Sequence, residues 1–146
     1  MEAWSEVYSS PMSLSLRRFQ LSLLPEDFAI VGLSPGSDIP AWATQGPFFS
    51  ITRTSEELSI MVEESRVPAG VEFQGGWRVI KVQGPFMLSE VGVLAAVVGP
   101  LAAARVSVLT IATFDTDYLL VASESLAVAV SALERAGHSF QRSQSN

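Results

Sequence analysis

The fold is decided by the stretch from Trp77 to Gln141, WRVIKVQGPFMLSEVGVLAAVVGPLAAARVSVLTIATFDTDYLLVASESLAVAVSALERAGHSFQ. Three runs rich in β-branched or aromatic residues predict strands, and a fourth can add a short edge strand: 77–82, 105–114, 117–122 and 138–141. Two further stretches predict helices: 89–104 and 123–136. The order strand, helix, strand, strand, helix, strand is that of the ferredoxin-like split βαβ fold. We therefore expect an α+β protein with an antiparallel sheet and both helices on one face.

Single residues mark the ends of both predicted helices. Ser89 stands at the N-cap position of the first helix, and Pro100 inside it predicts a bend near Val97. Ser123 caps the second helix, whose apolar residues recur every three or four positions. Gly137 then stands where a left-handed C-terminal cap belongs.

The first half of the chain looks like a reduced copy of the same unit. We expect an N-terminal arm at 1–11, a first unit at 12–70 and a second, complete unit at 71–146. Three strands are predicted in the first unit, the last two forming a hairpin: 14–24, 48–54 and 58–62. Glycines and prolines between Pro25 and Gly46 predict only short turns, and Gly75-Gly76 predicts a flexible joint between the units.

The composition indicates a globular protein and narrows its class. Of the 146 residues, 48% are hydrophobic and 16% are charged, which gives enough apolar surface to offset the chain entropy. The net charge is −6 and Lys81 is the only lysine, so binding to nucleic acid or to an anionic membrane surface is disfavoured. The sequence has no cysteine, which excludes disulfides, thiolate metal sites and cysteine nucleophiles.

No segment of the sequence predicts membrane insertion or secretion. The longest uninterrupted apolar run, 91–104, contains two glycines and a proline and is too short to span a bilayer. The first residues are acidic where a secretory signal needs basic ones. We therefore expect a soluble, cytoplasmic protein.

The sequence contains none of the common catalytic motifs. There is no phosphate-binding loop, no nucleophile elbow and no zinc-protease motif. The single histidine, His138, follows a predicted helix cap and precedes a polar tail, so we expect it at the surface rather than as a base or a metal ligand. The sequence therefore predicts no enzyme activity, no cofactor and no metal site.

A few residues near the predicted element ends are candidates for binding. Glu90, Asp115 and Asp117 lie at such positions, although Glu90 can simply complement a helix N-terminus while both aspartates make a hairpin turn. Gly92, in the first turn of the predicted helix, leaves the backbone open to close approach, and free N–H groups there can hold a carboxylate. The alternative for Gly92 is tight packing of the helix on the sheet.

Residues 77–138 resemble the ACT domain, in the branch found in the cytosolic arginine sensors called CASTOR and in small bacterial and fungal ACT proteins. The resemblance rests on short motifs: Trp77-Arg78, Gly84-Pro85, Glu90 to Leu94, Pro100 to Ala102, Val106 to Val108 and, above all, Thr113-Phe114-Asp115-Thr116-Asp117-Tyr118. Residues 47–64 are similar to the first, truncated ACT unit of the same proteins. The resemblance implies two tandem ACT units, the first one reduced.

In that family a free amino acid lies between two ACT units. The resemblance implies these ligand-binding residues: Met87, Glu90, Val91, Gly92, Val93, Ser107, Val108, Thr113, Phe114 and Asp117. The resemblance implies that the loop before the helix contacts the α-amino and α-carboxylate groups of the ligand, and that Thr113 and Phe114 contact the ligand through their backbone. It also implies that the carboxylate of Asp117 faces a cationic side chain of the ligand. The carboxylate of Asp117 makes a basic amino acid possible as the ligand, but Met87 departs from the glycine of the arginine sensors, so the resemblance does not specify arginine itself.

The arginine sensors carry four ACT units, whereas this chain has about two. The resemblance therefore implies a homodimer in which Ser107 and Val108 of one subunit face the loop and Asp117 of the other. The function it implies is that of a non-catalytic, amino-acid-binding regulatory or sensor protein. A structural module with an empty pocket, or a regulatory partner of a biosynthetic enzyme such as an aspartate kinase, are the alternatives.

Overall fold

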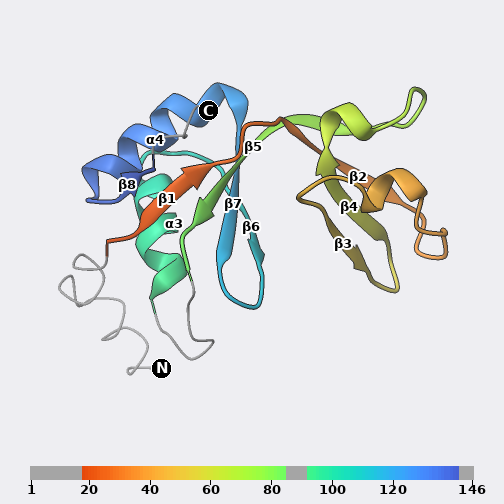
Figure 1. Cartoon of the computed structure of the whole chain (residues 1–146), viewed down its shortest axis with the longest axis horizontal. Helices are drawn as coiled ribbons and strands as arrows, with labels where there is room; N and C mark the ends of the chain where they lie inside the picture. The colour runs from red at the N-terminus through yellow and green to blue at the C-terminus, as the bar shows by residue number, and fades with distance from the viewer. Residues whose placement is uncertain (1–17, 85–91, 142–146) are drawn as a thin grey trace. The chain divides into compact units, whose positions relative to one another are not determined.

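The chain divides into two compact units in a computed structural model that describes residues 18–84 and 92–141 (Figure 1). One unit contains the residues up to Leu23 together with those from Ile80 onward, and we call it the C-terminal unit. The other comprises Leu24–Val79, and we call it the inserted unit because the chain leaves the C-terminal unit to form it and then returns.

The C-terminal unit contains all six predicted elements and has the α+β, ferredoxin-like architecture of the prediction. In chain order the elements are β5 (Gln74–Val82), α3 (Val93–Ala103), β6 (Leu109–Ala112), β7 (Asp117–Ala122), α4 (Leu126–Arg135) and β8 (Ser139–Phe140). A 3-10 turn, η3 (Ser123–Ser125), precedes α4. The predicted cap at Ser123 therefore begins this short turn rather than the α-helix.

A strand from the N-terminal part of the chain also belongs to this sheet. β1 (Gln20–Leu23) pairs antiparallel with β5, with Leu21 opposite Val82, and parallel with β8. The order in this unit is β8-β1-β5-β7-β6. The strand predicted at 14–24 was expected in the first unit, but its described part lies in the C-terminal unit. The compact units of the structure divide at Leu23/Leu24 and Val79/Ile80, and the expected domain boundary between 70 and 71 stays a prediction.

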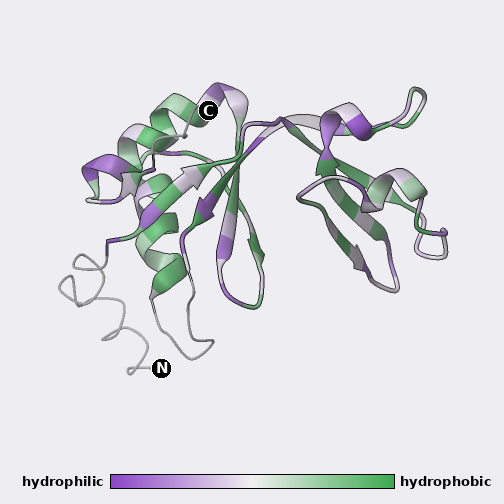
Figure 2. Ribbon diagram, viewed as in Figure 1, coloured by the Kyte–Doolittle hydropathy of each residue, from purple (hydrophilic) through white to green (hydrophobic). Residues whose placement is uncertain are grey.

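Both helices cover one face of this sheet, as the sequence predicted. Buried residues of both helices and of three strands form one core cluster: Val97 and Leu101 of α3, Ala129 and Leu133 of α4, Leu21 of β1, Ile80 and Val82 of β5, and Leu119 and Val121 of β7. Figure 2 shows hydrophobic residues along nearly all of α3, whereas the C-terminal end of α4 is polar. Burial of this cluster explains why β1 joins the C-terminal unit, since Leu21 has no exposed surface.

Each helix ends in a residue with a positive φ angle. Gly137 has φ 101°, and the next amide, of His138, donates to the Leu133 carbonyl over 3.1 Å, so the predicted left-handed cap is confirmed. Arg105 takes the same position after α3 with φ 60°, and the Val106 amide donates to the Leu101 carbonyl over 2.9 Å. This cap also explains why β6 is shorter than the predicted strand at 105–114.

Replacing Arg105 by glycine should stabilise the protein. A left-handed conformation costs a residue with a Cβ about 1 kcal/mol, and glycine removes that cost. We expect Arg105→Gly to raise the free energy of unfolding by about this amount in urea denaturation. Arg105→Ala keeps the Cβ and is the control. An equal gain in both variants would show that the side chain, not the φ angle, is responsible.

His138 lies in the core of the C-terminal unit, so the prediction of a surface position is wrong. Its residue surface is 4% exposed, and its Nδ1 accepts a hydrogen bond from the Phe19 amide over 3.0 Å. Because Nδ1 is an acceptor, Nε2 carries the proton, and it donates to the Ala96 carbonyl over 2.9 Å. Pro100 follows Ala96 by four residues and has no N–H, so it cannot supply the helical hydrogen bond to that carbonyl.

The contact between His138 and Ala96 can be tested through Pro100. We expect His138→Ala to lower the free energy of unfolding by about 3 kcal/mol, because two buried backbone groups lose their partner. In a Pro100→Ala background the new amide of residue 100 can bond to the Ala96 carbonyl. The same histidine substitution should then cost about 1 kcal/mol less. Additive effects in this double-mutant cycle, measured by urea denaturation, would contradict the explanation.

The inserted unit is a small sheet without an α-helix among its residues, all of which are described. Its elements are β2 (Phe28–Leu33), η1 (Ala41–Thr44), β3 (Ser50–Arg53), β4 (Leu58–Glu63) and η2 (Glu64–Arg66), followed by the first part of β5. The strand order is β3-β4-β2-β5, and the predicted hairpin is confirmed as β3 and β4. The expectation of turns alone between Pro25 and Gly46 is wrong, because β2 pairs along its whole length with β4.

Gly75 and Gly76 lie inside β5, so the predicted flexible joint is also wrong. They form a bulge opposite β2, where Phe28 pairs with Trp77 but Ile30 pairs with Gln74. The Gly76 amide donates to Glu64 Oε1 over 3.0 Å, and a Cβ on Gly75 would lie 1.7 Å from the same oxygen. The two glycines therefore let Glu64 approach the strand closely.

Candidate functional site

The turn between β6 and β7 carries three of the predicted ligand-binding residues. Residues 113–116 form a tight hairpin turn, in which the Thr113 amide donates to the Thr116 carbonyl over 2.9 Å. The Thr113 hydroxyl donates to the same carbonyl over 3.0 Å and accepts from the Thr116 amide over 3.3 Å. Thr113, Phe114 and Asp117 are therefore brought together by one hydrogen-bonded turn.

Asp117 has a different environment from Asp115, although both were considered turn residues. Asp115 lies in the turn and is exposed, whereas Asp117 is the first residue of β7, pairs with Ala112 across the hairpin and is half-buried. Within residues 18–84 and 92–141, the Asp117 carboxylate has no ion pair and no hydrogen bond. A half-buried carboxylate without a protein partner can bind a cationic group.

Thr116 is a residue of this site that the sequence analysis did not single out. Its residue surface is only 9% exposed, and its hydroxyl donates to the carbonyl of Val82 at the end of β5. Its position between two aspartates indicated exposure, because a residue flanked by polar neighbours in a turn is usually exposed, so no signal in the sequence pointed to its burial.

The start of α3 carries two further predicted residues, Gly92 and Val93. Gly92 is the N-cap with φ 85°, a conformation that favours glycine, and the Ala96 amide donates to its carbonyl over 3.0 Å. The described helix therefore begins at Val93, and Gly92 precedes its first turn. The N-cap predicted at Ser89 lies outside the described residues. Val93 is buried. Met87, Glu90 and Val91 lie outside the described residues.

Ser107 and Val108 lie at the opposite end of β6 from the turn. Ser107 is exposed, and Val108 packs against the core of the C-terminal unit. Val108 and Thr113 are five positions apart, which is roughly 16 Å along an extended strand. One C-terminal unit consequently does not bring these two residues next to Asp117. Phe114, at the tip of the turn, is 80% exposed.

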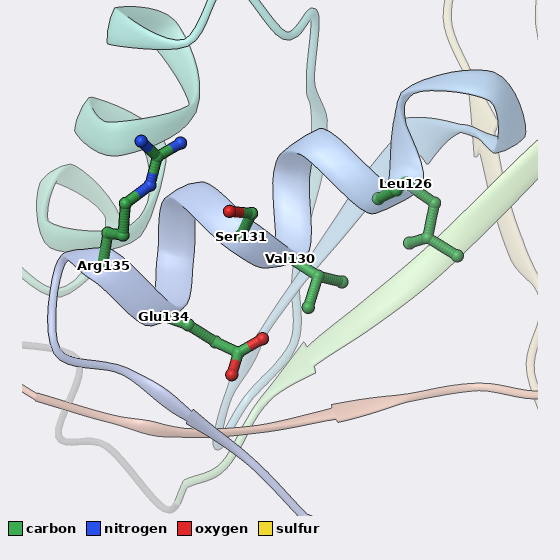
Figure 3. Close-up of a pocket in the computed structure, with 6 residues that line it drawn as sticks. Leu126, Val130, Ser131, Glu134 and Arg135 are labelled. Carbon is green, nitrogen blue, oxygen red and sulfur yellow. The ribbon is translucent and has the colours of Figure 1, made fainter.

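A separate hollow of about 690 Å³ runs along α4, and none of the predicted site residues lines it. Its lining includes Leu126, Val130, Glu134 and Arg135 (Figure 3). Figure 3 shows that the Glu134 and Arg135 side chains point to different sides of the helix, so the charged groups do not converge on a ligand.

Two negative findings apply to the part of the chain that the structure describes. No group of three or more His, Asp or Glu side chains there could hold a metal ion. No helix in the same residues is long and apolar enough to cross a membrane.

Comparisons with known proteins relate both parts of the chain to families. Residues 72–135 match a family model described as an ACT domain, and residues 26–70 match a model of an N-terminal domain. The Bos taurus cytosolic arginine sensor for mTORC1 subunit 1 is 35% identical over 102 residues, which cover 60% of this chain and 30% of the sensor. The chain thus spans only about 30% of the length of that curated relative.

Solved structures extend the likeness to nearly the whole chain. A crystal structure of an Agrobacterium tumefaciens protein is 41% identical with a TM-score of 0.81, covering 86% of this chain and 93% of that one. The regulatory subunit of aspartate kinase from Thermus flavus shares the fold at 12% identity, with a TM-score of 0.58 and coverage of 82% and 99%. The ACT-domain match over residues 72–135 and the ferredoxin-like architecture agree: this part of the chain is an ACT domain, and the chain is similar to the cytosolic arginine sensors.

Proposed function

We propose that this protein is a non-catalytic regulatory protein that binds a free amino acid with a cationic side chain. The observation that carries the proposal is the half-buried Asp117 carboxylate, which has no partner among the described residues. A lysine or arginine ligand would supply the missing cation through charge-assisted hydrogen bonds.

The start of α3 supports the other half of the proposal. Gly92 presents its backbone without a side chain, and a helix N-terminus favours the negative charge of an α-carboxylate. Thr113 and Phe114 are adjacent to Asp117 and offer backbone groups of an exposed turn. The named relatives are arginine sensors and regulatory subunits, and the word cytosolic in the sensors' name supports a cytoplasmic location.

The role of Asp117 is tested by removing its charge while keeping its shape. We expect Asp117→Asn to weaken binding of L-lysine and L-arginine roughly 10- to 100-fold in isothermal titration calorimetry, because a charge-assisted bond becomes a neutral one. Asp115→Asn removes an exposed carboxylate two residues away and is the matched control. Wild-type affinity in the Asp117 variant would contradict the role of Asp117. If the wild-type protein bound neither amino acid, the proposed function would be contradicted and the alternative of a structural module without a ligand would be favoured.

The distance along β6 supports a site completed by a second copy of the chain. Because Ser107 and Val108 lie at the far end of β6 from Asp117, we propose a twofold homodimer in which these residues of one subunit face Gly92 and Asp117 of the other. Each dimer would hold two equivalent sites.

Mixing two inactive variants tests this arrangement. Ser107→Arg and the charge reversal Asp117→Arg should each abolish binding of L-lysine, whereas both variants remain dimers of twice 15.7 kDa by size exclusion with light scattering. After subunit exchange in an equal mixture, half of the dimers contain one copy of each variant. Each of these dimers has one site with both an intact Asp117 and an intact Ser107, so about a quarter of the wild-type sites should be recovered. A monomeric protein, or a mixture without recovered binding, would contradict the dimer.

A further inference from the structure

The turn that carries Asp117 is fastened to the end of β5 by Thr116. The hydroxyl of this buried residue donates to the Val82 carbonyl, so it ties two segments that are 34 residues apart in the sequence. The bond is shielded from solvent, and water cannot easily replace a partner lost at such a position.

A second contact holds the same two segments together. A Cβ placed on Gly84 would lie 2.4 Å from the Asp115 carbonyl oxygen and 3.2 Å from the Thr116 Cβ. The first of these neighbours is backbone and cannot move aside as a flexible side chain can. The glycine therefore allows the chain leaving β5 to lie directly against the turn.

The turn itself is also closed by hydrogen bonds. The Thr113 hydroxyl and amide both donate to the Thr116 carbonyl, as described above. Thr116 thus takes part in each of these hydrogen bonds: its carbonyl and amide bond to Thr113, and its hydroxyl bonds to Val82. Asp117 follows directly, so the position of its backbone on the sheet depends on Thr116.

We propose that Thr116 is a positioning residue that sets the selectivity of the site for a cationic side chain. Recognition of charge by one carboxylate needs that group to be held within a fraction of an ångström, because hydrogen-bond strength falls steeply with misplacement. Thr116 holds Asp117 through the turn and the end of β5 without touching the ligand. This inference rests on the proposed function and adds a determinant of specificity to it.

The test compares L-lysine with L-norleucine, which has a similar side chain without the ammonium group. For the wild-type protein and each variant, titration calorimetry gives the ratio of the two affinities. We expect Thr116→Val, which keeps the shape and removes the hydroxyl, to lower this ratio about tenfold, equivalent to the loss of one hydrogen bond to a charged group. Thr116→Ser restores the hydroxyl and should restore the ratio. Thr52→Val, at an exposed threonine of β3, should leave the ratio unchanged.

The outcomes separate this inference from the proposed function. A wild-type protein that prefers lysine, with an unchanged ratio in Thr116→Val, would overturn the positioning role alone. A wild-type protein that binds neither amino acid would overturn the proposed function and this inference with it, as would binding without preference. If Thr116→Val does not fold by circular dichroism, Thr113→Val weakens the same turn from an exposed position and should lower the ratio in the same direction.

Discussion

A single imidazole joins three segments of the C-terminal unit. Pro100 leaves the Ala96 carbonyl inside α3 without its helical donor, and His138 Nε2 supplies one at 2.9 Å. On the other side of the ring, His138 Nδ1 accepts a hydrogen bond over 3.0 Å from the amide of Phe19, which lies immediately before β1. The buried imidazole of His138 thereby links α3, the C-terminal end of α4 and the residue just before β1. A proline in mid-helix is tolerated here because its missing hydrogen bond is replaced from another element.

This contact also explains how β1 reaches its place in the sheet. The Ser139 amide donates to the Phe19 carbonyl over 3.1 Å, and the Gln141 amide donates to the Leu21 carbonyl over 2.7 Å. With β8 on one side and β5 on the other, β1 has partners along both edges. The end of β5 is consequently set by β1 as well as by Thr116, so the candidate site depends on a strand that lies far from it in sequence.

Sequence patterns predict the structure correctly where a residue's position depends on its neighbours along the chain. The apolar period of residues 126–136 and the cap at Gly137 predicted α4, and the strand patterns predicted β5, β7 and the hairpin of β3 and β4. The patterns give no signal where a residue's partner is distant in the sequence. Nothing near Leu21 indicates that it pairs with Val82, and nothing near His138 indicates that Pro100 frees a carbonyl for it. β2 was missed because Gly32 and nearby prolines interrupt the pattern, although β4 supplies its hydrogen bonds. For the candidate site, the hairpin residues were found as a group, whereas buried Thr116 was hidden by its polar neighbours.

The inserted unit begins and ends at neighbouring positions on two paired strands of the C-terminal unit. Leu23 and Ile80 are paired across the antiparallel ladder of β1 and β5, and the next amide, of Leu24, donates to the Val79 carbonyl over 2.9 Å. The whole of Leu24–Val79 therefore occupies the place of a hairpin loop in its host. Loop length has little effect on the free energy of closing such a connection. A module at this position can be exchanged, lengthened or reduced to a tight turn during evolution, while the registers of the host sheet stay the same.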